Sequence, residues 1–338
     1  MRIAINGFGR IGRIFLRSVL AKPGIEVVAI NDLTDTETLA HLFKYDSVHR
    51  TFNGTVKCDS GNLYIDRKQI KVLSEKDPAN LPWKELNIDL VIESTGKFTS
   101  KHGASQHLLA GAKQVIISAP SSDKSVPTVV IGVNDTGFDL SAPIISNASC
   151  TTNNVAAMVK ILEDNWGIVD GYITTVHSMT GDQSLHDAPH KDLRRARAAS
   201  ASIIPTSTGA AKAITSIFPH LDGKLGGAGI RVPVLNGSLT DFTCSLKKQT
   251  TVEEINQAFR AAANGSMKNV LEYTEDPIVS TDILGNPHSC IFDSKLTSIV
   301  GGLVKVVGWY DNEMGYSSRL ADLVAKISVA KHDQVYSG

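Results

Sequence analysis

The sequence predicts two domains of different fold class, an α/β domain built on a doubly wound sheet and an α+β domain with a mixed or antiparallel sheet. Two observations support this assignment of fold classes. Before about residue 150, short apolar segments alternate with helical stretches, which is typical of parallel βαβ units covered on both faces. After residue 150, several strand-like segments follow one another with few helices between them, which indicates an α+β domain. The length of 338 residues fits two domains, at roughly 150 residues each.

The first part of the chain contains six short apolar segments that we expect to be strands. They lie at residues 2–6, 26–31, 89–93, 114–118, 128–131 and 144–146. Apolar residues recur at helical spacing between Ile11 and Leu20, so a helix is expected at 10–21, and a second helix is expected at 34–44.

The second part begins with a long predicted helix at 151–166 and a strand at 171–177. A polar, basic and irregular segment follows at 178–201. Further strands are expected at 229–233, 238–247, 289–293, 298–300 and 304–310, with helices at 252–263 and 316–327. The tail 328–338 is expected to be a polar, mobile terminus.

Charge and cysteine content exclude several classes of protein. The 34 Lys and Arg residues balance the 34 Asp and Glu residues, whereas general nucleic-acid and membrane-surface binders usually carry a basic excess. No apolar run approaches the length of about 18 residues that a transmembrane helix needs, and the first residues lack the apolar core of an export signal. The four cysteines form neither a CxxC pair nor a zinc spacing. We therefore expect a cytoplasmic protein without a disulfide framework.

A glycine-rich turn predicts a dinucleotide site. Gly7, Gly9 and Gly12 form a G-x-G-x-x-G pattern directly after a strand and at the start of a helix, which is the context that this motif needs. Asp32 ends the next strand, about 20 residues after Gly12, where a carboxylate binds the adenosine ribose. The helix N-terminus suits the pyrophosphate. An acid at position 32 favours NAD because it repels a 2′-phosphate.

Cys150 is the candidate nucleophile. It opens a predicted helix, where the helix dipole stabilises a thiolate. The alternative role for an isolated cysteine is that of a small buried hydrophobic residue. A thiolate needs a base, usually a histidine, and His177 ends a predicted strand, where catalytic groups commonly protrude. The alternative for His177 is an ordinary surface or hydrogen-bonded histidine.

No metal site is expected. His186 and His190 are four residues apart, a spacing that suits a zinc site on a helix. Pro189 lies between them, and proline disrupts the helix that such a site requires.

Seven motifs are spread along the chain. They are NGFGRIGR (6–13), KYDS (44–47), SNASCTTN (146–153), HKDLRRARAA (190–199), SIIPTSTGAAKA (202–213), RVP (231–233) and WYDNEMGY (309–316). Together they resemble the motifs of phosphorylating glyceraldehyde-3-phosphate dehydrogenase, in the order and at the spacing of that family. The combination of SCTTN and DNExGY is highly specific, and the resemblance covers nearly the whole chain.

The resemblance implies reversible, NAD-dependent oxidation of D-glyceraldehyde 3-phosphate to 1,3-bisphosphoglycerate, in glycolysis or gluconeogenesis. The Cys150 thiolate attacks the aldehyde to form a thiohemiacetal, and His177 takes the proton as hydride leaves for the nicotinamide. Inorganic phosphate then cleaves the thioester. As an imidazolium, His177 also keeps the thiolate ionised and supports the developing oxyanion.

The resemblance also assigns residues to the anions and the cofactor. Hydroxyls, a glycine N–H and guanidinium groups suit phosphate oxygens. Residues of the substrate and phosphate sites are Ser149, Thr151, Thr180, Arg195, Thr208, Gly209 and Arg231. Residues of the cofactor site are Gly7, Gly9, Arg10, Ile11, Gly12, Asp32, Ser118, Asn312 and Tyr316. Arg10 and Ile11 are expected at the pyrophosphate, Asn312 at the nicotinamide amide and Tyr316 beside the nicotinamide ring.

The expected domains follow from the same resemblance. Residues 1–150 form the NAD-binding Rossmann domain, with the C-terminal helix 313–338 packed back on it, and residues 151–312 form the catalytic domain. The segment 178–201 is expected to cross subunit interfaces in a homotetramer. The expected partners are the small-molecule substrate and inorganic phosphate, and neither a nucleic acid nor a membrane.

One departure from the family pattern and two rival functions remain. Ala188 and Pro189 stand where NAD-specific members often have Leu-Pro. A small residue at 188 leaves room for a 2′-phosphate, so NAD is the expected cofactor and the sequence leaves some use of NADP open. Erythrose-4-phosphate dehydrogenase shares the fold and the Cys–His pair, but it departs from the Thr208-Gly209 pair that this chain keeps. A non-catalytic binding or adhesion role would not need all of these residues.

Overall fold

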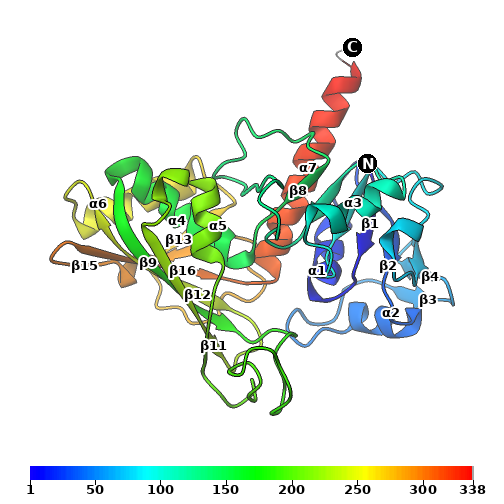
Figure 1. The fold of residues 1–338 in the computed structure, drawn as a ribbon, viewed down its shortest axis with the longest axis horizontal. Helices are drawn as coiled ribbons and strands as arrows, with labels where there is room; N and C mark the ends of the chain where they lie inside the picture. Colours follow the sequence, from blue (N-terminus) through cyan, green and yellow to red (C-terminus); the bar gives the residue numbers. More distant parts are fainter. Residues whose placement is uncertain (337–338) are drawn as a thin grey trace. The chain divides into compact units, whose positions relative to one another are not determined.

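The computed structural model describes the backbone of residues 1–336 and the side chains of residues 1–331. The chain divides into two units, which are described separately (Figure 1). The first comprises Met1–Val129, Gly137–Ala148 and the described residues from Ser317 onward. The second comprises Val130–Thr136 and Ser149–Tyr316. The domain limits expected from the sequence, at 150 and 313, remain predictions.

The first unit is built on an eight-stranded sheet with the order β3-β4-β5-β2-β1-β6-β7-β8. Its strands are β1 (Arg2–Asn6), β2 (Glu26–Asn31), β3 (Val56–Cys58), β4 (Asn62–Ile65), β5 (Lys68–Leu73), β6 (Leu90–Glu93), β7 (Val115–Ile117) and β8 (Ile144–Ser146). From β5 to β8 the pairing is parallel, whereas β3, β4 and β5 pair antiparallel. The central strands are almost entirely buried because helices cover a parallel sheet on both faces.

Three helices follow strands of this sheet, namely α1 (Arg10–Val19), α2 (Thr36–Lys44) and α3 (Lys101–Leu109). Asp35 caps α2 by accepting the Thr38 N–H, and Ser100 caps α3 by accepting the Gly103 N–H. The N-cap of α1 is Gly9, which has no side chain to do the same. The first turn of α1 therefore suits an external anion.

Two segments before residue 150 differ from what the sequence predicted. The hairpins β3–β4 and β4–β5 were not predicted, because their exposed, charged strands lack the apolar character of the central ones; Asp66, with φ of 54°, makes the second turn. The strand expected at 128–131 was wrong. Only Thr128 forms a bridge, to Ser146, and the chain then turns at Gly132, with φ of 81°.

The second unit contains a mixed eight-stranded sheet with the order β10-β11-β9-β12-β16-β14-β13, and β15 pairs with β16. Its strands are β9 (Ile168–Ser178), β10 (Ile204–Thr206), β11 (Leu225–Val232), β12 (Ser238–Leu246), β13 (Leu271–Thr274), β14 (Cys290–Asp293), β15 (Ser298–Val300) and β16 (Leu303–Tyr310). The parallel pair β9–β11 places Arg231 directly opposite His177. Strand β12 pairs antiparallel with β9 and β16, and β14 pairs antiparallel with β16 but parallel with β13.

Helix α4 (Cys150–Trp166) packs on this sheet, where it contacts β9, β12, β14 and β16 (Figure 1). Ser149 caps it by accepting the Thr152 N–H. Helices α5 (Ala210–Ile217) and α6 (Val252–Asn264) lie against α4, and Phe259 of α6 stacks on Phe292 of the sheet at 3.8 Å. Because α4 is buried along most of its length, its packing against the sheet fixes the position of its first residue, Cys150.

Helix α7 (Met314–Tyr336) is longer than the helix expected at 316–327 from the local pattern and lies within the range 313–338 that the family resemblance implies. Asp311 accepts the N–H groups of Glu313 and Met314 at its start. The tail expected to be irregular from Ser328 onward is helical to Tyr336 because no glycine or proline interrupts it; residues 337–338 lie outside the described chain. Short 3₁₀ turns occur at Pro78–Asn80, Pro219–Leu221 and Ser294–Leu296. The predicted fold class is confirmed, with a first sheet that is mixed rather than wholly parallel.

Candidate active site

Cys150 and His177 come together at the N-terminus of α4. Cys150 is the first residue of this helix, and His177 lies near the end of β9, which α4 contacts. The Cys150 Sγ lies 3.5 Å from the His177 Nε2. Cys150 is partly buried, and His177 is 6% exposed. A thiol and an imidazole at this distance can exchange a proton.

The far side of the imidazole faces a backbone carbonyl and a guanidinium group. The His177 Nδ1 lies 2.8 Å from the Ser178 carbonyl oxygen, and the Arg231 Nη1 donates to the same oxygen at 3.0 Å. When Nδ1–H donates to this carbonyl, Nε2 is the unprotonated nitrogen and faces the thiol. The contact between Arg231 and His177 follows from the register of β9 and β11.

Burial acts on the charge state of the Cys150–His177 pair. It raises the pKa of the Cys150 thiol, and neither the nearby Arg231 nor the Thr151 N–H compensates fully. Burial, and after it the positive charge of Arg231, lowers the pKa of His177 to about 3. Desolvation thus favours the neutral thiol and the neutral imidazole, and it opposes the thiolate and imidazolium that the family resemblance implies.

Thr180 and Arg195 are joined by Asp182. The carboxylate of Asp182 accepts a hydrogen bond from the Thr180 hydroxyl and a charge-assisted one from the Arg195 Nη1 at 2.6 Å. The Arg195 Nε donates to the Thr206 hydroxyl at 3.0 Å. Thr206 belongs to β10, which pairs with β11, the strand of Arg231. Asp182 was not predicted, and a lone acid in an irregular polar segment carries no signal that would have identified it.

The other predicted anion-site residues lie at helix starts. Thr208 precedes Gly209, the N-cap of α5, and its hydroxyl accepts the Ala210 N–H at 3.2 Å. Within residues 1–336, neither Thr208 nor Gly209 is hydrogen-bonded to the Cys150–His177 pair. The Ser149 hydroxyl is engaged in capping α4. The Thr151 hydroxyl lies 2.9 Å from the buried Tyr310 hydroxyl and therefore points into the protein.

Asn312 and Tyr316 lie at the start of α7, in the second unit. Asn312 is 6% exposed and Tyr316 is 3% exposed. The Asn312 Oδ1 accepts hydrogen bonds from Ser178, Gly237 and Ser238. Its amide nitrogen is consequently the group that can donate to a ligand.

The glycine turn borders a pocket of about 680 Å³ in the first unit. Gly7 has φ of 91°, and a Cβ there would approach the Thr95 nitrogen within 2.7 Å; a Cβ on Gly9 would meet open space. Asp32 is held by the N–H groups of Phe8, at 2.8 Å, and Thr34, at 3.0 Å. A pocket with an uncapped helix start and a fixed carboxylate fits a dinucleotide with an unmodified ribose. Its lining residues are Asn6, Gly7, Gly9, Asn31, Asp32, Leu33, Glu75, Lys76, Asp77, Pro78, Ser94, Thr95, Lys97 and Phe98.

The remaining predicted cofactor residues support this turn. A Cβ on Gly12 would approach the Gly7 carbonyl oxygen within 2.3 Å, so only glycine permits this close packing of helix and strand. The Arg10 guanidinium binds Asp46 through two hydrogen bonds, at 2.6 and 3.1 Å. Burial alone would raise the pKa of Asp46, but these bonds and backbone N–H groups lower it to about 2. Arg10 and Ile11 open α1, and Ser118 follows β7.

A buried polar cluster beneath the pocket escaped prediction. Glu93, at 1% exposure, accepts hydrogen bonds from the Asn6 amide at 2.6 Å and the Thr95 N–H at 2.8 Å. The Trp83 Nε1 donates to the His107 Nδ1, so the His107 Nε2 carries the proton and donates to Glu93 at 3.0 Å. A glutamate ending an apolar strand was the available signal. The cluster holds Asn6 and Thr95, which line the pocket.

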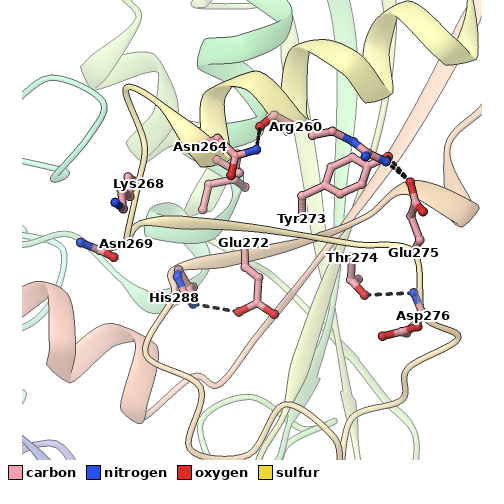
Figure 2. A pocket seen from close by; sticks show the side chains of 12 residues that line it. Arg260, Asn264, Lys268, Asn269, Glu272, Tyr273, Thr274, Glu275, Asp276 and His288 are labelled. Carbon is pink, nitrogen blue, oxygen red and sulfur yellow. Dashed lines mark hydrogen bonds and ion pairs between the residues drawn. The ribbon is translucent and has the colours of Figure 1, made fainter.

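A further pocket of about 500 Å³ lies beside α6 and β13 and contains none of the predicted site residues (Figure 2). Arg260 pairs there with Glu275, and His288 pairs with Glu272 at 2.9 Å. Among the residues described, no group of three His, Cys, Asp or Glu side chains is arranged to hold a metal ion. Over the same part of the chain, no helix is long and apolar enough to cross a membrane.

Comparison with known proteins identifies the family. The description "Glyceraldehyde 3-phosphate dehydrogenase, NAD binding domain" matches residues 1–101, and "Glyceraldehyde 3-phosphate dehydrogenase, C-terminal domain" matches residues 149–312. The chain belongs to the glyceraldehyde-3-phosphate dehydrogenase family. The family resemblance of the sequence is thereby confirmed.

Several members of the glyceraldehyde-3-phosphate dehydrogenase family are similar over almost their whole length. The enzyme of Mycobacterium avium is 54% identical over 97% of this chain and 98% of its own. That of Geobacillus stearothermophilus is 53% identical with the same coverage. Glyceraldehyde-3-phosphate dehydrogenase 2 of Streptomyces avermitilis is 53% identical over 96% of this chain and 97% of its own. The chain is thus an oxidoreductase of this family with NAD as its cofactor, as predicted.

Proposed function

We propose that Cys150 and His177 carry out the phosphorylating oxidation of D-glyceraldehyde 3-phosphate by NAD. The observation that carries this proposal is the 3.5 Å approach of the Cys150 Sγ to the His177 Nε2, with Arg231 beside the same imidazole. The group supplies a nucleophile, a base and a cation for a phosphorylated aldehyde.

The first step is attack of the Cys150 sulfur on the aldehyde carbon. Because burial favours the neutral forms of both groups, His177 accepts the thiol proton as the S–C bond forms. It then gives this proton to the substrate oxygen, which completes the thiohemiacetal. The Ser178 carbonyl stabilises the transient imidazolium by accepting its Nδ1–H.

The second step oxidises the thiohemiacetal to a thioester. NAD, when bound, would supply the hydride acceptor for this oxidation. His177 takes the hydroxyl proton, so that the carbonyl can form. Asn312 would hold the nicotinamide amide through its side-chain nitrogen.

The third step is cleavage of the thioester by inorganic phosphate. A phosphate oxygen bonds to the acyl carbon, the C–S bond breaks, and His177 returns its proton to the Cys150 sulfur. Arg231, Arg195 and Thr180 bind phosphate oxygens. Thr208 and Gly209 complete the two anion sites, and Asp182 keeps Thr180 and Arg195 together.

Initial rates with glyceraldehyde 3-phosphate test the reaction and the cofactor. NADH formation that requires inorganic phosphate supports the proposal, and the same assay with NADP measures how far that cofactor can replace NAD. Turnover with erythrose 4-phosphate alone would assign the chain to the rival dehydrogenase. The absence of turnover with both aldehydes would favour a binding role.

Replacement of Arg231 with alanine is expected to lower kcat/KM for glyceraldehyde 3-phosphate by about 10²-fold or more, because charge-assisted hydrogen bonds to the substrate phosphate are lost. The matched substrate is unphosphorylated glyceraldehyde, for which we expect a much smaller loss. Initial rates with both aldehydes check this result. Equal losses for the two substrates would remove Arg231 from the phosphate site.

A homotetramer is also proposed, in which the segment 178–201 contacts a neighbouring subunit. Leu185 and Leu193 in this segment are 65% and 82% exposed, and large apolar side chains are costly in water. Sedimentation velocity should give the mass of four chains; the mass of one chain at micromolar concentration would contradict the proposal. The cytoplasmic location remains a prediction from the sequence.

A further inference from the structure

Three donors converge on the side-chain oxygen of Asn312. The Ser178 and Ser238 hydroxyls each lie 2.9 Å from the Asn312 Oδ1, and the Gly237 N–H donates to it at 3.2 Å. Ser178 is fully buried, and Ser238 is 1% exposed. The oxygen end of this amide is therefore enclosed by donors that the protein itself supplies.

This arrangement determines which way the amide points. The Gly237 backbone nitrogen can only donate, so the Asn312 atom facing it must be the oxygen. The Ser238 oxygen already accepts the Ser178 N–H at 3.1 Å, which leaves its hydroxyl proton for Asn312. The amide nitrogen consequently faces away from all three donors.

Ser178 also connects this network to the reacting groups. Its carbonyl oxygen accepts a hydrogen bond from Arg231 at 3.0 Å and lies 2.8 Å from the His177 Nδ1. Ser178 thus contacts two sets of groups. Its carbonyl oxygen faces His177 and Arg231, and its hydroxyl donates to Asn312. A substitution that removes only the hydroxyl leaves the backbone contacts to His177 and Arg231 in place.

We propose that Ser178 and Ser238 are positioning residues, whose hydroxyls hold the Asn312 amide so that its nitrogen donates to the carboxamide of the nicotinamide ring. This inference rests on the proposed role of Asn312 in cofactor binding. The hydroxyls act on cofactor affinity through Asn312 and contact neither the adenosine half of NAD nor the aldehyde.

The test compares NAD with ADP-ribose, which lacks the nicotinamide ring, in equilibrium binding to the full-length enzyme. The double variant Ser178→Ala/Ser238→Ala should raise the Kd for NAD about tenfold, since the loss of two hydrogen bonds lets the amide rotate. The Kd for ADP-ribose should stay within about twofold. The matched control is Ser294→Ala, another buried serine of the second unit, whose hydroxyl donates to the Thr274 carbonyl; neither Kd should change.

Asn312→Asp separates this inference from the function on which it rests. The aspartate still accepts from the three donors but has no N–H to donate, so it should weaken NAD binding and spare ADP-ribose. If this variant loses NAD affinity while the double serine variant does not, the positioning role is wrong and the proposed function stands. If Asn312→Asp binds NAD normally, both the role of Asn312 and the inference are overturned. Equal losses for NAD and ADP-ribose in the serine variant would also overturn the inference, and Ser178→Ala alone carries the test if the double variant does not fold.

Discussion

Replacement of Cys150 with serine is expected to lower kcat by about 10⁴-fold or more, because a hydroxyl is a much weaker nucleophile and forms no thioester for phosphate to cleave. The oxygen of serine fits the same place at the N-terminus of α4. Binding of NAD should be retained, since Cys150 does not line the pocket beside the glycine turn. Single-turnover and steady-state NADH formation measure the loss.

Two controls accompany this variant. Cys290→Ser replaces a fully buried cysteine of the same unit and should leave kcat within a few-fold, although it puts a hydroxyl in an apolar site. NAD titration of Cys150→Ser should give the wild-type Kd. Turnover of Cys150→Ser near the wild-type rate would eliminate Cys150 as the nucleophile.

Replacement of His177 with asparagine is expected to lower kcat by about 10²- to 10⁴-fold, the usual contribution of a general base. The base serves four proton transfers in the proposed sequence, so both aldehyde oxidation and phosphate cleavage should slow. Asparagine keeps a side-chain N–H for the Ser178 carbonyl but has no basic nitrogen for the thiol. Pre-steady-state rates of NADH formation and of acyl phosphate release check the two steps separately; a wild-type rate in both would exclude His177 as the base.

The pH dependence of the same reaction follows from the lowered pKa of His177. A base must be unprotonated to act, and a pKa of about 3 keeps this imidazole neutral throughout the range from pH 7 to pH 5. The kcat/KM of the wild-type enzyme should therefore show no loss from protonation of His177 at the ordinary histidine pKa near 6.5. A loss centred near pH 6.5 that disappears in His177→Asn would contradict the neutral resting pair.

Much of the fold and the candidate site could be predicted because the signals are local. The glycine turn, the strand before it and the helix after it lie within about twenty residues, and Asp32 follows at the spacing of one βαβ unit. Cys150 was placed at a helix start by the helical pattern that follows it. Family motifs then extended the assignment to residues such as Asn312, whose role no local pattern indicates.

The hairpins β3–β5 and the turn at residues 131–134 were missed for a different reason, and the local pattern ended the C-terminal helix too early, at Ile327. In these segments the local preference is weak, and the outcome depends on pairing and packing with distant residues. Glu93 and Asp182 were missed in the same way. Their importance lies in the partners that the fold brings to them.

Local sequence patterns thus sufficed for the fold class, the dinucleotide turn and the nucleophile at the start of α4, because each depends on residues close together in the chain. The contact between His177 and Arg231 depends on the register of two strands separated by more than fifty residues, which no local pattern specifies. The pKa shifts of Cys150 and His177 depend likewise on burial, which exists only in the folded chain. Desolvation by the surrounding protein therefore favours the neutral forms of the two reacting groups.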